Sequence, residues 1–206
     1  MPTALLAALL LAAEAPPDPD FEVAGFEHAL TVGPIEPGRM LLSGDLGWLR
    51  SGVRFDIGLG VEVDLVARLD AFLLEGVRSG QVEQASFFAG LRVSPLALGR
   101  VRLSATGEIG EVIGSGTDLG ANLLAFRGEL AVGVALAEPW LAAARVGVRS
   151  LKGKRFDDTR WQEDAEVALA LERRFGRLVG AAEGSTVLQP GLAPILQWRL
   201  RVGLAL

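Results

Sequence analysis

The sequence contains no cysteine, no tyrosine and a single histidine, His28. Without cysteine the chain can form neither a disulfide nor a thiolate metal site, and it cannot carry a lipid attached through that residue. One histidine without any cysteine also falls short of the ligand set of a typical zinc site. We therefore expect no metal and no cofactor, and the cellular compartment has to be inferred from other features.

Long apolar runs and concentrated positive charge are also missing. Apolar residues make up 50% of the 206 residues, yet no run reaches the roughly 18 to 20 consecutive apolar residues of a membrane-spanning helix. The net charge of −5 and the lack of a dense Lys/Arg cluster exclude the basic face that nucleic-acid binding requires. The length fits one domain.

The N-terminal residues have the pattern of an export signal. Residues 4–13 form an apolar block, and Ala13-Glu14-Ala15 follows it as a small-x-small cleavage pattern, which predicts a signal peptide over residues 1–15. A short N-terminal helix is the alternative. Residues 16–38 are rich in proline and predict an extended lead-in outside the core, so that the folded domain spans residues 39–206.

Beyond residue 38 the sequence predicts an all-β fold. Polar and apolar residues alternate with a period of two, and turn residues separate the alternating runs. We expect about ten strands, with eight as the alternative count; residues 39–58 could also form one long strand paired with residues 26–33. The candidate strands are 39–44, 48–58, 61–74, 84–94, 99–112, 123–136, 140–149, 163–173, 177–184 and 195–206.

The prolines and the links support these boundaries. The last four prolines (Pro95, Pro139, Pro190 and Pro194) fall between the candidate strands, as expected because proline cannot donate to a central ladder. Short links alternate with longer, more polar ones at 75–83, 113–122, 150–162 and 185–194. In an up-and-down meander every second link lies at the same end, so this alternation predicts one end with tight turns and one with long loops.

Alternation alone leaves open which face of the strands meets water, because soluble and membrane barrels share the same period. Three observations favour an apolar face that points outward. The only lysines, Lys152 and Lys154, lie in one predicted loop, although lysine is common on the solvated face of soluble β-proteins. The charges on the polar face nearly balance, and the four tryptophans, Trp48, Trp140, Trp161 and Trp198, lie at or near strand ends, as interface aromatics do.

The polar face therefore predicts a lumen filled by ion pairs between arginine and carboxylates. Ten arginines face eight acids on the candidate strands. The arginines are Arg54, Arg68, Arg92, Arg100, Arg102, Arg127, Arg145, Arg149, Arg199 and Arg201; the acids are Asp56, Glu62, Asp64, Asp70, Glu108, Glu129, Glu166 and Glu172.

With these features the chain resembles the small outer-membrane β-barrels of diderm bacteria. The final alternating strand, "ILQWRLRVGLAL", is similar to the C-terminal signal by which those proteins are recognised for insertion. It ends in Leu206, where that family usually ends in Phe or Trp, and the family's usual tyrosines are missing. The resemblance implies an up-and-down antiparallel transmembrane barrel in the outer membrane, with both termini in the periplasm.

Three stretches are candidates for catalysis or ligand binding. Outer-membrane barrels that are enzymes resemble one another in using a histidine as the base. The only histidine here, His28, lies in the lead-in without an adjacent serine or acid pattern. The glycines of residues 114–120 lack phosphate-binding spacing. The acids Asp157, Asp158, Glu163 and Asp164 could hold a divalent cation, but basic residues alternate with them, which favours a solvated loop.

From these features we expect a non-catalytic barrel in contact with outer-membrane lipid, with a structural or surface-interaction role and a narrow lumen closed by charges. Its long loops could bind lipopolysaccharide or a cell-surface partner. The alternatives are a narrow channel for small solutes and a soluble periplasmic ligand-binding barrel. Ten strands enclose little more than their own side chains, which favours the closed lumen.

Overall fold

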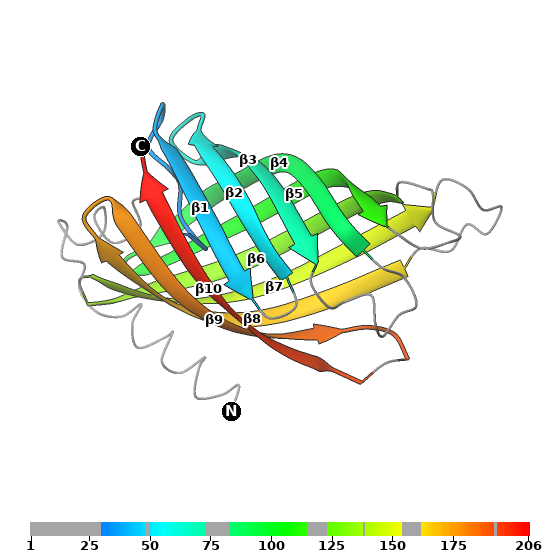
Figure 1. Cartoon of the computed structure of the whole chain (residues 1–206). Coiled ribbons are helices and arrows are strands. Elements are labelled where there is room, and N and C mark those ends of the chain that lie inside the picture. The colour runs from blue at the N-terminus through cyan, green and yellow to red at the C-terminus, as the bar shows by residue number, and fades with distance from the viewer. Residues whose placement is uncertain are drawn as a thin grey trace.

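Ten antiparallel strands form a closed barrel (Figure 1). The computed structural model describes residues 30–47, 50–72, 83–114, 123–137, 139–153, 162–191 and 193–206. Each strand pairs with its neighbours in the chain, and β1 pairs with β10 to close the ring. The strands are β1 (Met40–Gly47), β2 (Arg50–Gly58), β3 (Val63–Phe72), β4 (Glu83–Leu98), β5 (Val101–Gly114), β6 (Leu123–Ala137), β7 (Trp140–Gly153), β8 (Gln162–Phe175), β9 (Leu178–Leu188) and β10 (Ile195–Ala205).

The up-and-down barrel with ten strands is thus confirmed, and the alternative of one long strand over residues 39–58 is wrong. That region forms two strands that pair with each other, with Leu41 opposite Asp56 and Leu46 opposite Ser51. Residues 30–33, the described part of the proposed partner strand, lie in bends. The second neighbour of β1 is β10. This pairing uses the backbone N–H and C=O groups that would otherwise be free at the edges of both strands, so the barrel has no open edge.

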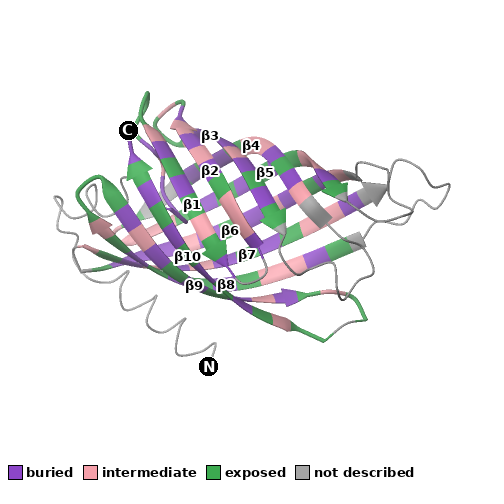
Figure 2. Cartoon of the chain, viewed as in Figure 1, coloured by how far each residue is buried: buried purple, intermediate pink, exposed green. Residues whose placement is uncertain are grey.

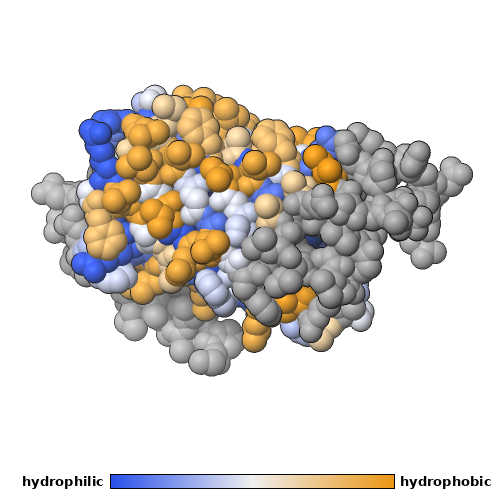
Figure 3. All heavy atoms as spheres, viewed as in Figure 1, coloured by the Kyte–Doolittle hydropathy of each residue, from blue (hydrophilic) through white to orange (hydrophobic). Residues whose placement is uncertain are grey.

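Burial alternates along the strands (Figure 2), and most of the large apolar side chains of the strands lie on the exposed face. In β10 the side chains of Trp198, Leu200 and Val202 are exposed, whereas those of Arg199 and Arg201 are buried. Hydrophobic residues predominate on the part of the outer wall that is coloured in this view, and hydrophilic residues gather at its left end (Figure 3). No helix among the described residues is long and apolar enough to cross a membrane.

Several strands extend beyond the bounds that the sequence predicted. β4, β7 and β9 each continue by four residues at the end where we expected a link. The expectation that every late proline lies between strands is wrong for Pro95, which lies inside β4. The ladder with β5 shifts its register between Val93 and Leu96, so Pro95 occupies a bulge, where a residue without an N–H is tolerated.

The two ends of the barrel differ in their links. At one end, here called the turn end, the links are residues 59–62, 99–100, 138–139 and 176–177, and β10 ends there. At the other end, the loop end, the links are 48–49, 73–82, 115–122, 154–161 and 189–194. Trp140 lies at the turn end and Trp198 near the loop end, both on the outer surface. Trp48 and Trp161 lie outside the described residues, as does the predicted signal peptide.

Part of the predicted lead-in packs inside the barrel. Leu30, Val32 and Ile35 are 3%, 0% and 1% exposed, although the sequence places them in the lead-in. Residues 30–36, here called the inner segment, therefore belong to the core of the barrel. Residues 30–38, the described part of the proline-rich segment, form no helix or strand, as predicted. The segment packs inside because burying the apolar surface of Leu30, Val32 and Ile35 is favourable.

Candidate functional site in the barrel lumen

A belt of ion pairs crosses the lumen between the inner segment and the loop end. The alternation of the strands turns every second residue inward, so charged residues on eight strands meet inside the barrel. We call this set the charge belt. Its members are Arg50, Arg68, Asp70, Glu108, Arg127, Glu129, Arg145, Glu166, Glu183, Arg199 and Arg201.

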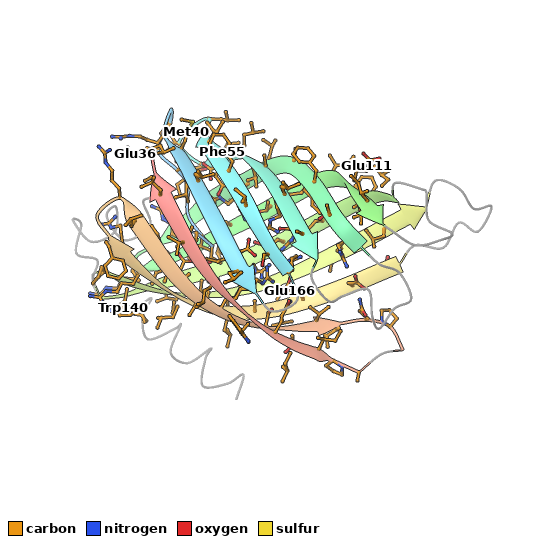
Figure 4. The ribbon with its side chains drawn as sticks, in the orientation of Figure 1. Glu36, Met40, Phe55, Glu111, Trp140 and Glu166 are labelled. Atoms are coloured by element: carbon orange, nitrogen blue, oxygen red, sulfur yellow. The ribbon has the colours of Figure 1, made fainter. Side chains whose placement is uncertain are left out.

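Glu166 on β8 is the carboxylate at which the charge belt converges (Figure 4). Its oxygens lie 3.1 Å from a nitrogen of Arg145, 3.7 Å from Arg50 and 4.0 Å from Arg127, and they also contact Arg199. Arg50 belongs to β2 and Arg127 to β6, which lie on opposite sides of β8 in the ring. These contacts therefore span the lumen rather than follow its wall.

Arg145 on β7 has the densest set of close carboxylate contacts. Its guanidinium lies 2.8 Å from Glu129, 2.7 Å from Glu183 and 3.1 Å from Glu166. The guanidinium is planar and carries five donors, so it can bind several carboxylates at once. Burying so many charges is costly unless each is paired, which explains why arginines and acids alternate inside the belt.

A second charged cluster lies nearer the turn end. The Nε atom of Arg92 is 2.8 Å from Oδ2 of Asp64, and the Nε atom of Arg54 is 2.8 Å from Oδ1 of Asp56. A nitrogen of Arg92 also lies 4.0 Å from Asp56, which joins the two pairs. The backbone N–H of Ile35 donates a hydrogen bond of 3.0 Å to Oδ1 of Asp64, so this cluster also holds the inner segment.

The inner segment fills the lumen on the turn side of the charges. Leu30 and Ile35 cluster with inward side chains of β1 and β9, whereas Val32 clusters with inward side chains of β6 and β7. The segment therefore reaches walls on different sides of the barrel. The wall residues in these two clusters are Leu41, Ala131, Ala135, Leu141, Val179 and Ala181.

The barrel wall carries glycine where the inner segment approaches it most closely. A Cβ atom at Gly58 would collide with the carbonyl oxygen of Glu36, and one at Gly203 would lie 2.6 Å from Cδ2 of Leu30. The wall and the segment are thus fitted to each other, since backbone contact at Gly58 leaves no room for a side chain.

Most of the charged residues that the sequence predicted for the lumen are found there, but two, Glu62 and Arg100, lie in links between strands. Glu62 is exposed in the link between β2 and β3, because β3 starts only at Val63. Arg100 lies in the link between β4 and β5. Arg102 is half-buried at the start of β5, on the same inward face as Ser104 and Glu108. Those placed inside are Arg54, Asp56, Asp64, Arg68, Asp70, Arg92, Glu108, Arg127, Glu129, Arg145, Arg149, Glu166, Glu172, Arg199 and Arg201.

The lumen residues that the sequence analysis missed include Arg50, Glu183 and Asp164. Arg50 lies on the same face of β2 as the predicted Arg54, and Glu183 lies on the inward face of β9 with Ala181, so the period of two could have identified them. Asp164 was assigned to a solvated acidic loop. It instead lies inside the barrel on β8, with Oδ2 at 2.7 Å from a nitrogen of Arg149.

The other candidate sites find no support among the described residues. Glu163 and Asp164 are successive residues of β8, so one is exposed while the other is buried in the lumen, and the proposed cation cluster is not formed by this pair. No group of three potential metal ligands occurs in the described part of the chain. His28, Asp157, Asp158 and residues 115–120 lie outside it.

A closed barrel with apolar residues outside and paired charges inside is the architecture of an outer-membrane β-barrel. In hydrocarbon every backbone polar group must be paired within the protein, and a ring of strands without an edge meets that requirement. The exposed leucines, valines and phenylalanines can face lipid, and the short turns at one end match the periplasmic turns of this class.

Solved structures with a similar fold come from bacterial outer membranes. They include a loop L8 deletion mutant of OmpT, an outer membrane protein of Vibrio cholerae (9% identity, TM-score 0.41, covering 82% of this chain and 98% of that chain). The KdgM porin has 10% identity and a TM-score of 0.41, covering 81% of this chain and 98% of that chain. Pseudomonas aeruginosa OccK5 has 13% identity and a TM-score of 0.25, with 76% and 57% covered. No protein-family model and no curated protein matches the sequence.

Proposed function

We propose that this protein is a non-catalytic scaffold of the outer membrane whose lumen is closed to solutes and whose long links form its interaction surface. The observation that supports this proposal most directly is that two barriers follow each other along the lumen. The inner segment brings Leu30, Val32 and Ile35 into its turn side, and the contacts of Glu166 with arginines of β2, β6, β7 and β10 cross it further on.

One cavity beside the charge belt is small. A cavity of about 40 Å³ is bounded by Arg50, Arg127, Asp164, Glu166 and Gln197. This volume accommodates one or a few water molecules rather than a sugar or an amino acid. The charged residues pair with one another, an arrangement suited to filling space and holding the strands rather than to activating a nucleophile.

Single-channel recording in planar bilayers tests the closed lumen. We expect the full-length protein to insert without producing conductance steps. Replacing Leu30, Val32 and Ile35 together by serine removes the apolar barrier and should still leave the bilayer silent, because the charge belt remains. Regular steps from the unmodified protein would contradict the proposal and favour the alternative, a narrow channel for small solutes.

A soluble ligand-binding barrel fits this chain poorly, since large apolar side chains cover its exposed wall while most charged side chains of the strands are paired inside. Cell fractionation with heat-modifiable gel mobility checks the membrane assignment. We expect the protein in the outer-membrane fraction, with a mobility that changes on boiling. Extraction into buffer without detergent would contradict it.

We further propose that lipopolysaccharide or a surface partner binds at the links 73–82, 115–122, 154–161 and 189–194. The length of these links at one end of the barrel supports this assignment, because such loops lie outside the cell in this class. Shortening each link to a tight turn should preserve folding and abolish the interaction.

A further inference from the structure

Aromatic and basic side chains meet on the outer surface at the turn end of β7 and β8. The Cζ atom of Arg173 lies 5.0 Å from the ring centroid of Trp140 and 4.7 Å from that of Phe175. All three side chains are exposed. Trp140 lies at the same end of the barrel as Glu36 and Met40 (Figure 4). Within the described part of the chain Arg173 forms no ion pair with a carboxylate, so its charge is available to a ligand.

Within the described part of the chain, the exposed residues next to Arg173 at this link carry positive charge, although the whole chain carries a net charge of −5. A second arginine, Arg177, is exposed in the link that leads to β9. Gly176, with φ of 62°, makes this link tight and keeps the arginines close together. This part of the turn end therefore attracts an anion.

A hollow lies in the outer wall beside this cluster. Its volume is about 630 Å³, and it lies over β5 to β8. Small side chains at Ala105 and Ala144 lie between larger outward residues such as Leu103, Leu130, Val146 and Leu169. Trp140 pairs with Arg173, and Ala144 pairs with Leu169 four residues further along both strands, so the hollow begins about 13 Å from the arginine.

We propose that this surface binds one anionic glycerophospholipid of the membrane leaflet at the turn end. The headgroup phosphate contacts Arg173, with Arg177 adding positive charge, and an acyl chain lies in the hollow over Ala144. Guanidinium groups bind phosphate through charge-assisted hydrogen bonds, and tryptophan is favoured at the level of the headgroups. Because apolar wall and basic cluster follow each other along the same two strands, one amphipathic molecule can occupy both.

Charge and position argue for this occupant over two others. A second copy of the chain would bring its own arginines toward this cluster if the contact were symmetric, which is unfavourable. Lipopolysaccharide is the lipid expected around the long loops, whereas Arg173 lies at the end with the short turns. An anionic phospholipid fits both the sign of the charge and the end of the barrel.

Native mass spectrometry of the full-length barrel in detergent tests the proposal with three probes: phosphatidylglycerol, phosphatidylethanolamine and lipopolysaccharide. We expect one retained phosphatidylglycerol, bound at least about fivefold more tightly than phosphatidylethanolamine. Arg173→Gln should weaken its binding roughly fivefold. Ala144→Leu, which fills the hollow without changing charge, should weaken it about tenfold.

Matched controls separate this site from general effects. Arg39→Gln removes an exposed arginine elsewhere at the turn end, and Ala67→Leu enlarges an outward alanine on β3, so both should leave binding unchanged. Heat-modifiable mobility checks that each variant is folded, and the comparison of lipids on the unmodified protein needs no variant. The proposal would be overturned if the two phospholipids bound equally or if lipopolysaccharide were retained preferentially. It would also be overturned by dimers that Ala144→Leu dissociates, or if Arg173→Gln weakened phosphatidylglycerol binding and Ala144→Leu did not.

Discussion

The backbone N–H of Leu30 donates a hydrogen bond of 2.9 Å to Oε2 of Glu172, which lies 142 positions later in the chain. Glu172 belongs to the inward face of β8, so this contact fastens the inner segment to the barrel wall from inside. At the other end of the segment Ile35 is held by Asp64. The sequence predicts Asp64 and Glu172 as ion-pair partners in the lumen. In the structure each of them accepts a hydrogen bond from a backbone N–H group of the inner segment, which the sequence placed outside the folded domain.

Removing the side chain of Ile35 should destabilise the barrel. Ile35 is 1% exposed among apolar neighbours, and replacing a buried isoleucine by alanine costs about 2 to 5 kcal/mol because a cavity remains. We expect a loss of this size for Ile35→Ala in urea unfolding of the refolded protein. Ile109→Ala makes the same change at a lipid-facing site that is 52% exposed and should cost clearly less. Equal losses would mean that the inner segment is not part of the core.

The contacts of Arg145 predict a strong effect of its neutralisation. Arg145→Met leaves Glu129, Glu166 and Glu183 with less positive charge, and breaking a buried pair typically costs about 3 to 5 kcal/mol. The expected result is a lower urea midpoint of unfolding.

Two further variants control for the loss of a charge as such. Arg39→Met breaks the exposed pair with Glu36 and should change stability by less than about 1 kcal/mol. Adding Glu129→Gln to Arg145→Met should recover part of the loss, because one uncompensated carboxylate disappears. A double variant less stable than Arg145→Met would contradict this electrostatic account.

Neighbouring residues on β6 test which face meets lipid. Leu130 is 66% exposed on the outer wall, whereas Ala131 is 5% exposed inside. Since the chain has no cysteine, a spin label can be attached at Leu130→Cys or Ala131→Cys alone. In liposomes we expect high accessibility to dissolved oxygen for the label at position 130 and low accessibility at position 131. The reverse order would place the apolar face away from lipid.

Close backbone contact makes Gly90 a sensitive position. A Cβ atom there would collide with the carbonyl oxygen of Gly107 on the neighbouring strand, so Gly90→Ala has to displace backbone. We expect a loss of about 1 to 3 kcal/mol in the free energy of unfolding. Gly184→Ala is the control, since no atom lies within 4 Å of its added Cβ. Similar stability of the two variants would show that β4 and β5 can move apart at Gly90 without lowering the free energy of unfolding.

The strands were predictable because each depends on a local pattern. Along Arg199, Leu200, Arg201 and Val202 the period of two decides which side chains share a face, whatever the rest of the chain does. The bulge at Pro95 was not predictable in this way, because it reflects pairing with β5 rather than the residues of β4 alone. The extensions of β7 and β9 likewise depend on partners that continue beside them.

The sequence by itself determined the period of the strands, their even number and the chemical contrast between their faces, since these follow from the order of residues along each strand. Only the tertiary structure decided that Glu166 meets Arg50 and Arg127 across the lumen and that Leu30 reaches Glu172. These partners lie far apart in the chain and come together only when closure of the ring brings the inward faces of different strands into one narrow space.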